Sequence, residues 1–454
     1  MEKTNNFTEG AITAPLLKFA LPVLGALLLQ SLYGGVDMFV VGNFGTTADV
    51  SAVNTGSWLM MTITQVIIGL SMGTTILLGQ MIGMKREGEL GDVMGTGICL
   101  FAILGLCVTF IIEVFARPIA TLMQSPQEAF AGTVLYLRIC GGGLLFIVAY
   151  NLLGALFRGL GNSRVPLMTV AIACFLNIAG DFALVGGYHM GVAGAAIATV
   201  AAQALSVVIS LVIIKRNGVS FDFGIKNIRI NKTHLKATVK LGLPIAFQDT
   251  LISISFLVVT AIVNSLGVTA SAGIGVAEKL CGFIMLVPSA LMQSMAAFVA
   301  QNIGAGKWNR ALKTLKSGLI ISAAAGIIMA YFTFFHGDFM ASLFAAGKED
   351  VIACAYEYLK AYAIDTLLVS GMFCFVGFFN GCGRTRFVML QGITGAFLVR
   401  IPFSFAMKMR QPVSLFWIGM ATPASSLLQL IICLLYFAFV YMQMKKGEKM
   451  PSAI

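Results

Sequence analysis

Two aspartates stand inside long apolar stretches of this chain, where a charged side chain is costly. Asp37 lies in the first apolar stretch and Asp181 lies in the fifth. One charged side chain at the centre of a membrane helix costs about 2.5–3.5 kcal/mol, so such residues are usually neutralised, partnered or part of an ion path. The pair predicts a cation-binding role, and a structural role in contacts between helices is the alternative.

Two further polar residues extend this candidate site. Asn177 precedes Asp181 by one helical turn, so both side chains point the same way. Thr199 comes early in the sixth apolar stretch, which would return across the membrane and place Thr199 at a similar depth. Carboxylate, amide and hydroxyl oxygens suit hard cations, and carboxylates also take up protons. We therefore expect Asp37, Asn177, Asp181 and Thr199 to bind a proton, a sodium ion (a possible metal site) or both.

The composition shows which elements must hold these residues. The chain has 454 residues, of which 58% are hydrophobic and only 11% are charged, whereas a soluble chain carries about 25% charged residues. A helix needs about 20 apolar residues to cross a bilayer. Twelve stretches meet this length, and they are 15–42, 54–80, 93–116, 133–157, 165–187, 192–214, 238–265, 272–300, 314–336, 354–379, 386–407 and 413–443.

The basic residues predict the orientation of these spans. Most of the 30 Lys and Arg residues fall in connections that lie on one side when the N-terminus is placed inside the cell. This arrangement obeys the positive-inside rule, and it explains the net charge of +11 without a nucleic-acid partner. We expect a multi-pass protein of a bacterial or archaeal cytoplasmic membrane with both termini cytoplasmic.

An internal repeat divides the chain into two halves. Phe157-Arg-Gly-Leu-Gly-Asn-Ser-Arg164 returns 222 residues later as Phe379-Asn-Gly-Cys-Gly-Arg-Thr-Arg386, and Leu21-Pro22 returns as Leu243-Pro244 at the same offset. Parallel repeats of this kind are typical of secondary transporters. We predict an all-α integral membrane protein of twelve transmembrane helices in two pseudo-symmetric six-helix lobes. The lobes are 1–214 (helices 1–6) and 238–454 (helices 7–12), joined by a cytoplasmic linker at 215–237.

The repeat also separates shared positions from specialised ones. Asp37 corresponds to Val259 and Asp181 corresponds to Phe403, so the second half lacks both carboxylates at the matching positions. Other polar residues of the apolar stretches are candidates for the lining of a substrate cavity. These are Gln30, Tyr33, Glu278 and Asp365, and an ion-pair network with Lys279 and Arg400 is the alternative for the last two.

The sequence shows no residue pattern typical of a disulfide framework, a metal site or an enzyme active site. The nine cysteines form no C-x-x-C pair, the three histidines lie far apart, and no nucleophile–base pair stands out. We expect no cofactor, apart from the coupling ion, and no enzymatic activity. The connections are also too short for the binding or signalling parts of a receptor.

Together these residues resemble the multidrug and toxic compound extrusion (MATE) family. The resemblance rests on the stretch from Gln30 to Gly42 with its aspartate, on Gly79-Gln80 with Gln301-Asn-Ile-Gly304, and on the paired Phe-x-Gly-x-Gly segments. It implies cation-driven export by alternating access. Within the family, the chain is similar to the branch named after the DNA-damage-inducible protein DinF. That similarity implies a cation site in the first lobe, formed by Asp37, Asn177, Asp181 and Thr199.

The resulting hypothesis is a cation-coupled multidrug efflux antiporter, driven by protons or sodium ions. It would export organic, often cationic and amphipathic compounds, and it would work as a monomer in the lipid bilayer. A flippase for a lipid-linked precursor is the alternative within transport, although its pyrophosphate cargo would need a strongly cationic cavity. Deep basic residues number only Lys279 and Arg400. A membrane-embedded enzyme or receptor is the alternative of a different class.

Overall fold

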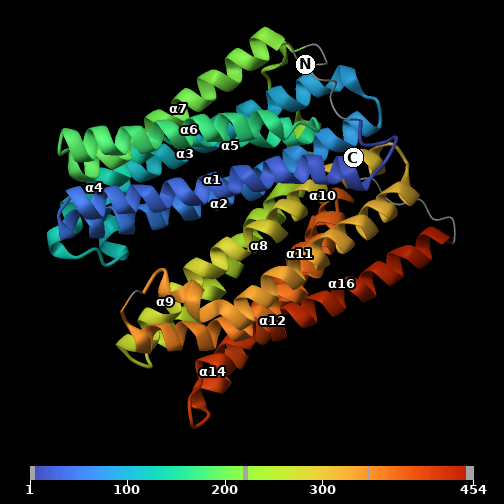
Figure 1. Cartoon of the computed structure of the whole chain (residues 1–454). Helices are drawn as coiled ribbons and strands as arrows, with labels where there is room; N and C mark the ends of the chain where they lie inside the picture. Colours follow the sequence, from blue (N-terminus) through green and yellow to red (C-terminus); the bar gives the residue numbers. More distant parts are fainter. Residues whose placement is uncertain (1–5, 218–222, 346, 446–454) are drawn as a thin grey trace. The chain divides into compact units, whose positions relative to one another are not determined.

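The computed structural model describes residues 6–217, 223–345 and 347–445. Residues 218–222 of the predicted linker and the C-terminal Lys446 and Lys449 lie outside the described residues. Throughout the described ranges the regular elements are helices, with no strand (Figure 1). The all-α prediction is therefore confirmed.

The first half of the chain contains eight helical elements up to the linker. They are α1 (Thr13–Phe44), α2 (Thr47–Gly83), α3 (Glu87–Leu122), α4 (Gln127–Gly142), α5 (Leu144–Gly159), α6 (Arg164–Asp181), the π-helix η1 (Phe182–Gly187) and α7 (Gly191–Asn217). A short 3-10 turn, η2 (Ile225–Asn227), follows in the linker.

The second half repeats this plan with more interruptions. Its elements are α8 (Lys232–Asn264), α9 (Val268–Ile284), α10 (Leu286–Gly304), α11 (Trp308–Ser342), α12 (Glu349–Gly381), α13 (Thr385–Ile393), the π-helix η3 (Thr394–Arg400), α14 (Ile401–Met409), α15 (Leu415–Gly419) and α16 (Ala421–Lys445).

Eleven helical segments of the described chain are long and apolar enough to cross a membrane. The pair α4 and α5, bent by 52°, supplies a twelfth if it counts as one span. The bend lies at Gly143, where an added Cβ would lie 2.3 Å from Cγ1 of Val200 in α7. Only glycine permits this close approach. The twelve predicted spans thus match the helices observed, and the chain is a multi-pass membrane protein.

Local sequence signals explain where some of these helices begin and bend. Thr46 caps α2, since its hydroxyl accepts from the backbone N–H of Asp49 while the Asp49 carboxylate accepts from the backbone N–H of Thr46. Pro22 lies inside α1 and its repeat-related partner Pro244 lies inside α8. A proline within a helix removes one backbone hydrogen bond, so both helices have a deformable point near their start.

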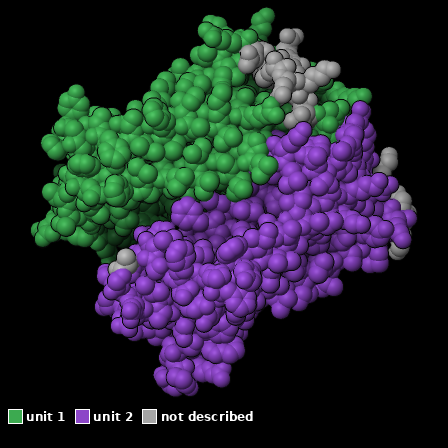
Figure 2. All heavy atoms as spheres, viewed as in Figure 1, with its two compact units in different colours: residues 1–7, 21–246 green, residues 8–20, 247–454 purple. Residues whose placement is uncertain are grey.

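The chain forms two compact units, shown in different colours in Figure 2. Unit 1 consists of Met1–Phe7 and Leu21–Ala246, and unit 2 consists of Thr8–Ala20 and Phe247–Ile454. The first residues of α1 therefore belong to unit 2, and the first part of α8 belongs to unit 1. The lobe boundaries at 214 and 238 stay a prediction.

Unit 2 holds the beginning of α1 through backbone contacts. The Arg310 guanidinium donates to the carbonyl oxygens of Glu9 at 2.7 Å, Gly10 at 2.7 Å and Ala11 at 3.1 Å. At the first residue of α1, the hydroxyls of Thr13 and Ser317 are hydrogen-bonded at 3.1 Å. Charge-assisted hydrogen bonds of this kind are stronger than neutral ones, so Arg310 fixes this segment firmly.

Unit 1 holds the linker in a similar way, against the start of α3. Asp92 accepts from the Asn227 amide at 3.0 Å and from the Arg229 guanidinium at 3.3 Å. The linker passes so close to α3 that a Cβ on Gly95 would lie 1.8 Å from the carbonyl oxygen of Asn227. The Thr96 hydroxyl donates to the carbonyl oxygen of Arg229 at 3.2 Å. The approach to α8 is thus fixed before the helix begins.

Candidate functional site

Three helices of unit 1 carry the four residues predicted to bind a cation. Asp37 lies on α1, Asn177 and Asp181 lie on α6, and Thr199 lies on α7 (Figure 1). Helices α6 and α7 pack closely because small residues face each other, and a Cβ on Gly180 would lie 3.0 Å from Cβ of Ala198. This close packing lets short polar side chains on the two helices meet.

The four residues are brought together inside unit 1. Asp181 is fully buried, and Asn177 and Asp37 are only 2% and 7% exposed. The Asn177 Nδ2 donates to the Thr199 hydroxyl at 3.3 Å. Asp37 is close enough to Asp181 for their charges to interact. Repulsion between two such carboxylates makes a bound cation favourable.

Several buried acceptor atoms at this site lack a donor. Within the described part of the chain, no hydrogen-bond partner reaches Oδ1 of Asp37, Oδ1 of Asn177 or either carboxylate oxygen of Asp181. A buried polar atom left unsatisfied costs about 1–3 kcal/mol, and more when it is charged. A proton or a sodium ion would satisfy these oxygens, so the donor set fits the coupling ion expected from the sequence.

A π-helix begins directly after Asp181. Helix α6 ends at Asp181 and continues as η1, whose wider turn changes the direction in which the following side chains point. In the second half, the π-helix η3 ends at Arg400, another buried charged residue. π-helical turns inside α-helices occur frequently at functional sites. Apolar periodicity gives no sign of either one, because both lie within continuous apolar stretches.

Two residues that the sequence reasoning missed also belong to this region. Gln203 lies one turn after Thr199 on α7, and its carbonyl oxygen Oε1 has no hydrogen-bond partner among the described residues. Tyr136 on α4 accepts a hydrogen bond from the Ser57 hydroxyl at 2.9 Å, and its phenol interacts with Asp37. The four-residue spacing from Thr199 was the signal that could have identified Gln203. No spacing rule links Tyr136 to the site.

The two substrate-cavity candidates on α1 have polar partners within unit 1. Gln30 donates from Nε2 to the Tyr150 hydroxyl at 3.0 Å. The Tyr33 phenol interacts with the Gln203 side-chain amide and with the Asp37 carboxylate. Both side chains are half-buried. Gln30, Tyr33 and Asp37 therefore line one face of α1, spaced by three and four residues.

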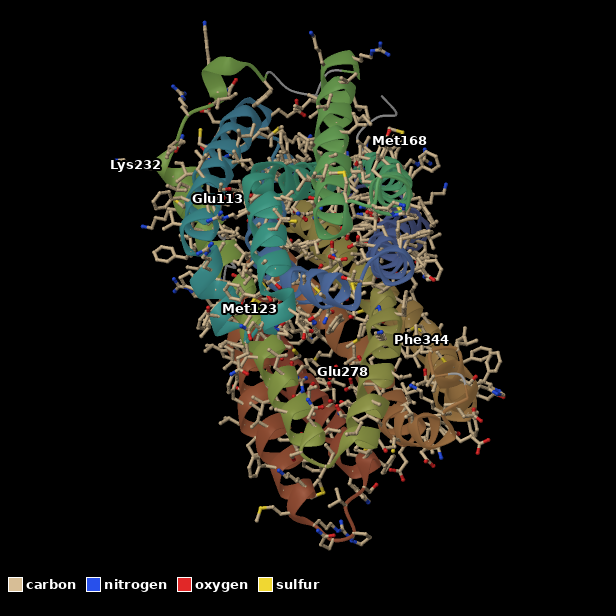
Figure 3. The ribbon with its side chains drawn as sticks, turned by 90° about the vertical axis from the view of Figure 1, so that its left-hand side faces the viewer. Glu113, Met123, Met168, Lys232, Glu278 and Phe344 are labelled. Carbon is tan, nitrogen blue, oxygen red and sulfur yellow. The ribbon has the colours of Figure 1, made fainter. Side chains whose placement is uncertain are left out.

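Unit 2 contains the other two candidates in a separate polar cluster. Glu278 on α9, labelled in Figure 3, accepts a hydrogen bond from the Thr260 hydroxyl at 2.5 Å. Asp365 on α12 is fully buried, and its carboxylate interacts with the Ser426 side chain and with the Arg400 charge. Both carboxylates interact with the thiol of Cys281, so they flank the same residue.

Arg400 is the buried cation of this second cluster. Its guanidinium donates to the Ser255 hydroxyl at 2.8 Å and lies 4.1 Å from the centre of the Phe256 ring. Its charge interacts with that of Asp365. A buried arginine near a buried carboxylate partly balances its charge. Lys279 is exposed. An ion-pair network and a role in substrate binding both stay predictions for this cluster.

A many-helix membrane fold with buried carboxylates and a repeated half is typical of membrane transporters. A family model described as MatE matches residues 22–183 and, a second time, residues 244–406. The chain therefore belongs to the MatE (MATE) family, and it is a membrane transporter and not an enzyme. The two matches begin 222 residues apart, which is the offset of the repeat found in the sequence.

The chain is similar over nearly its whole length to several transport proteins. It is 24% identical to the "Probable multidrug resistance protein YoeA" of Bacillus subtilis, over 93% of each chain. It is 23% identical to the "Multidrug export protein MepA" of Staphylococcus aureus, over 88% of this chain and 89% of MepA.

Solved structures share the same fold. The "Crystal structure of MATE in complex with MaL6" matches with a TM-score of 0.92 at 17% identity, covering 98% of this chain and 100% of the other. A structure described as the "Outward-facing conformation of a multidrug resistance MATE family transporter of the MOP superfamily" matches with a TM-score of 0.91 at 17% identity, over 97% and 98% of the two chains. These matches confirm the predicted fold class.

Proposed function

We propose that this transporter is a multidrug efflux antiporter in which protons or sodium ions entering the cell drive the export of organic compounds. The observation that carries the proposal is the buried group of oxygens without donors at Asp37, Asn177 and Asp181. A group of this kind in a membrane protein is expensive to maintain without an ion that binds to it. Thr199 completes the proposed cation site through its hydrogen bond with Asn177.

The repeat supports a specialised role for this site. Val259 occupies the position of Asp37 in the second half and is buried among apolar residues. The fold shared by the two halves therefore does not require a carboxylate there. Cation binding that differs between two conformations shifts their populations, and neutralising one buried carboxylate supplies about 2.5–3.5 kcal/mol for such a shift.

The names of the relatives indicate the kind of cargo. YoeA and MepA are named as multidrug resistance and multidrug export proteins. We infer that the cargo of this chain is likewise a set of small organic molecules, often cationic and amphipathic, and that Gln30, Tyr33, Glu278 and Asp365 contact it. We also infer a DinF-like branch, a monomer, and a cytoplasmic membrane location with both termini inside the cell.

Transport by purified protein in liposomes tests this function. Efflux of ethidium, a fluorescent organic cation, is measured under an imposed proton gradient and, separately, under a sodium gradient with choline as the replacement. Asp37→Asn is expected to abolish gradient-driven efflux, because the amide cannot take up a proton and carries no charge for sodium. Asp338→Asn is the matched control, since Asp338 is exposed and belongs to unit 2. Undiminished driven efflux in Asp37→Asn would contradict the proposed site.

A further inference from the structure

A line of polar side chains extends from the proposed cation site toward the opposite end of unit 1. On α1, Tyr33 lies four residues before Asp37, and Gln30 lies three residues before Tyr33. All three side chains therefore lie on one face of the helix. On α7, Gln203 lies one turn from Thr199 and its amide interacts with the Tyr33 phenol. The first step away from Asp37 thus pairs a phenol with an amide.

The line then passes from α1 to α5. Gln30 donates to the Tyr150 hydroxyl at 3.0 Å, and the Tyr33 and Tyr150 phenols also interact. Tyr150 and Arg158 lie two turns apart on the same face of α5. We call Tyr33, Gln203, Gln30, Tyr150 and Arg158 the polar ladder.

Arg158 ends the polar ladder in the last turn of α5. A Cβ on Gly154 would lie 3.2 Å from Nη1 of Arg158, so the guanidinium folds back along the helix over Gly154 toward Tyr150. The charge of Arg158 interacts with the Tyr150 phenol. The missing side chain at Gly154 therefore leaves space for a permanently charged group beside the last phenol.

The polar ladder extends across about half of a membrane. Asp37 and Gln30 are seven residues apart, and the Arg158 guanidinium lies over Gly154, four residues from Tyr150, which at 1.5 Å per helical residue amounts to about 16 Å. The hydrocarbon core of a bilayer is about 30 Å thick. Under the proposed orientation, Arg158 lies at the cytoplasmic end, so the polar ladder leads from the cation site toward the cytoplasm.

We propose that the polar ladder is the route by which a proton leaves the Asp37–Asp181 site for the cytoplasm. This inference rests on the proposed function and selects the proton as the ion that travels this way. Hard metal cations such as Ca²⁺ need six to eight oxygen ligands, and each step of the ladder offers only a phenol and an amide. A hydroxyl can accept a proton on its oxygen and release its own, with water bridging the amides.

The arginine raises the energy of a proton at the cytoplasmic end of this route. A proton that reaches Tyr150 meets the positive charge of Arg158, so it does not accumulate on the Tyr150 hydroxyl. The same charge disfavours the entry of cations from the cytoplasmic end. Within the polar ladder no carboxylate stands between Asp37 and Arg158 to trap the proton on its way.

The test compares the rate of coupled transport with its end point. Tyr150→Phe removes only the hydroxyl, and Gln203→Leu removes the amide on a different helix. Both are expected to slow proton-driven ethidium efflux roughly a hundredfold to ten-thousandfold, which is the contribution that one proton-transfer group typically makes. The final ethidium ratio across the membrane should stay unchanged, because Asp37 and Asp181 still set the coupling. Slowing by heavy water should be larger in both variants than in the wild type, since proton release then limits the rate. Tyr188→Phe, at an exposed tyrosine, is the control.

The possible failures have different meanings. Wild-type rates in both Tyr150→Phe and Gln203→Leu would overturn the polar ladder and leave the cation site intact. Efflux driven by a sodium gradient alone, with no response to a proton gradient, would also overturn the polar ladder while supporting an ion site at Asp37. Driven efflux that survives Asp37→Asn would reject the proposed function itself.

Discussion

Asp181→Asn is the substitution that most directly probes the energetics of the proposed cation site. Asp181 is fully buried, both of its carboxylate oxygens lack donors, and its charge interacts with that of Asp37. The asparagine has nearly the same shape, so packing around the site should be kept. The substitution removes one of the two negative charges of the site, those of Asp37 and Asp181.

The size of the effect follows from the cost of that charge. A charged side chain in a membrane helix costs about 2.5–3.5 kcal/mol, and a bound cation relieves that cost. Losing this contribution should weaken cation binding by roughly 60- to 300-fold, since about 1.4 kcal/mol corresponds to a factor of ten. The full loss of cation affinity is expected only if the Asp181 carboxylate contacts the bound cation directly.

Ligand-dependent thermal unfolding measures this change in purified protein. A ligand that binds only the folded protein stabilises it by an amount that grows with the logarithm of its concentration above its dissociation constant. The wild type is titrated with sodium chloride against choline chloride at fixed pH, and with acid at fixed sodium. One of these two titrations is expected to stabilise the wild type. Asp181→Asn should shift the midpoint of that titration by roughly 60- to 300-fold in ion concentration, and Asp338→Asn should leave the midpoint unchanged. An unshifted midpoint in Asp181→Asn, with the protein folded, would refute the reasoning.

Two further substitutions test the packing and the second polar cluster. Gly143→Ala places a methyl group against Val200, at a distance of 2.3 Å from Cγ1, so it should destabilise the protein by about 1–3 kcal/mol in denaturation of the reconstituted protein. A fully stable Gly143→Ala variant would contradict the close passage of α5 and α7. Arg400→Met removes the buried cation that faces Asp365, so it should lower stability by about 3–5 kcal/mol, and the double variant with Asp365→Leu should recover much of the loss. A loss in the double variant equal to the sum of the losses in Arg400→Met and Asp365→Leu alone would show that the two charges are not coupled.

The sequence identified the main architecture because the bilayer imposes a simple length requirement. Twelve apolar stretches of sufficient length predicted the spans, and the repeat of Leu21-Pro22 at Leu243-Pro244 predicted two related halves. The helices extend a few residues beyond the predicted ends, as in α2, where Thr46 caps the helix before the apolar stretch begins. The bend at Gly143 was not predicted, because it depends on the neighbouring Val200.

The sequence by itself determined which residues of the candidate site are unusual, since a carboxylate in an apolar stretch is costly wherever the helix packs. The repeat added that Asp37 and Asp181 have no counterparts at Val259 and Phe403. Only the tertiary structure decided that the Asn177 amide meets the Thr199 hydroxyl, and that Gln203 belongs beside them. The physical reason is that helical spacing places side chains on a face of one helix, whereas contacts between helices depend on how their surfaces pack together.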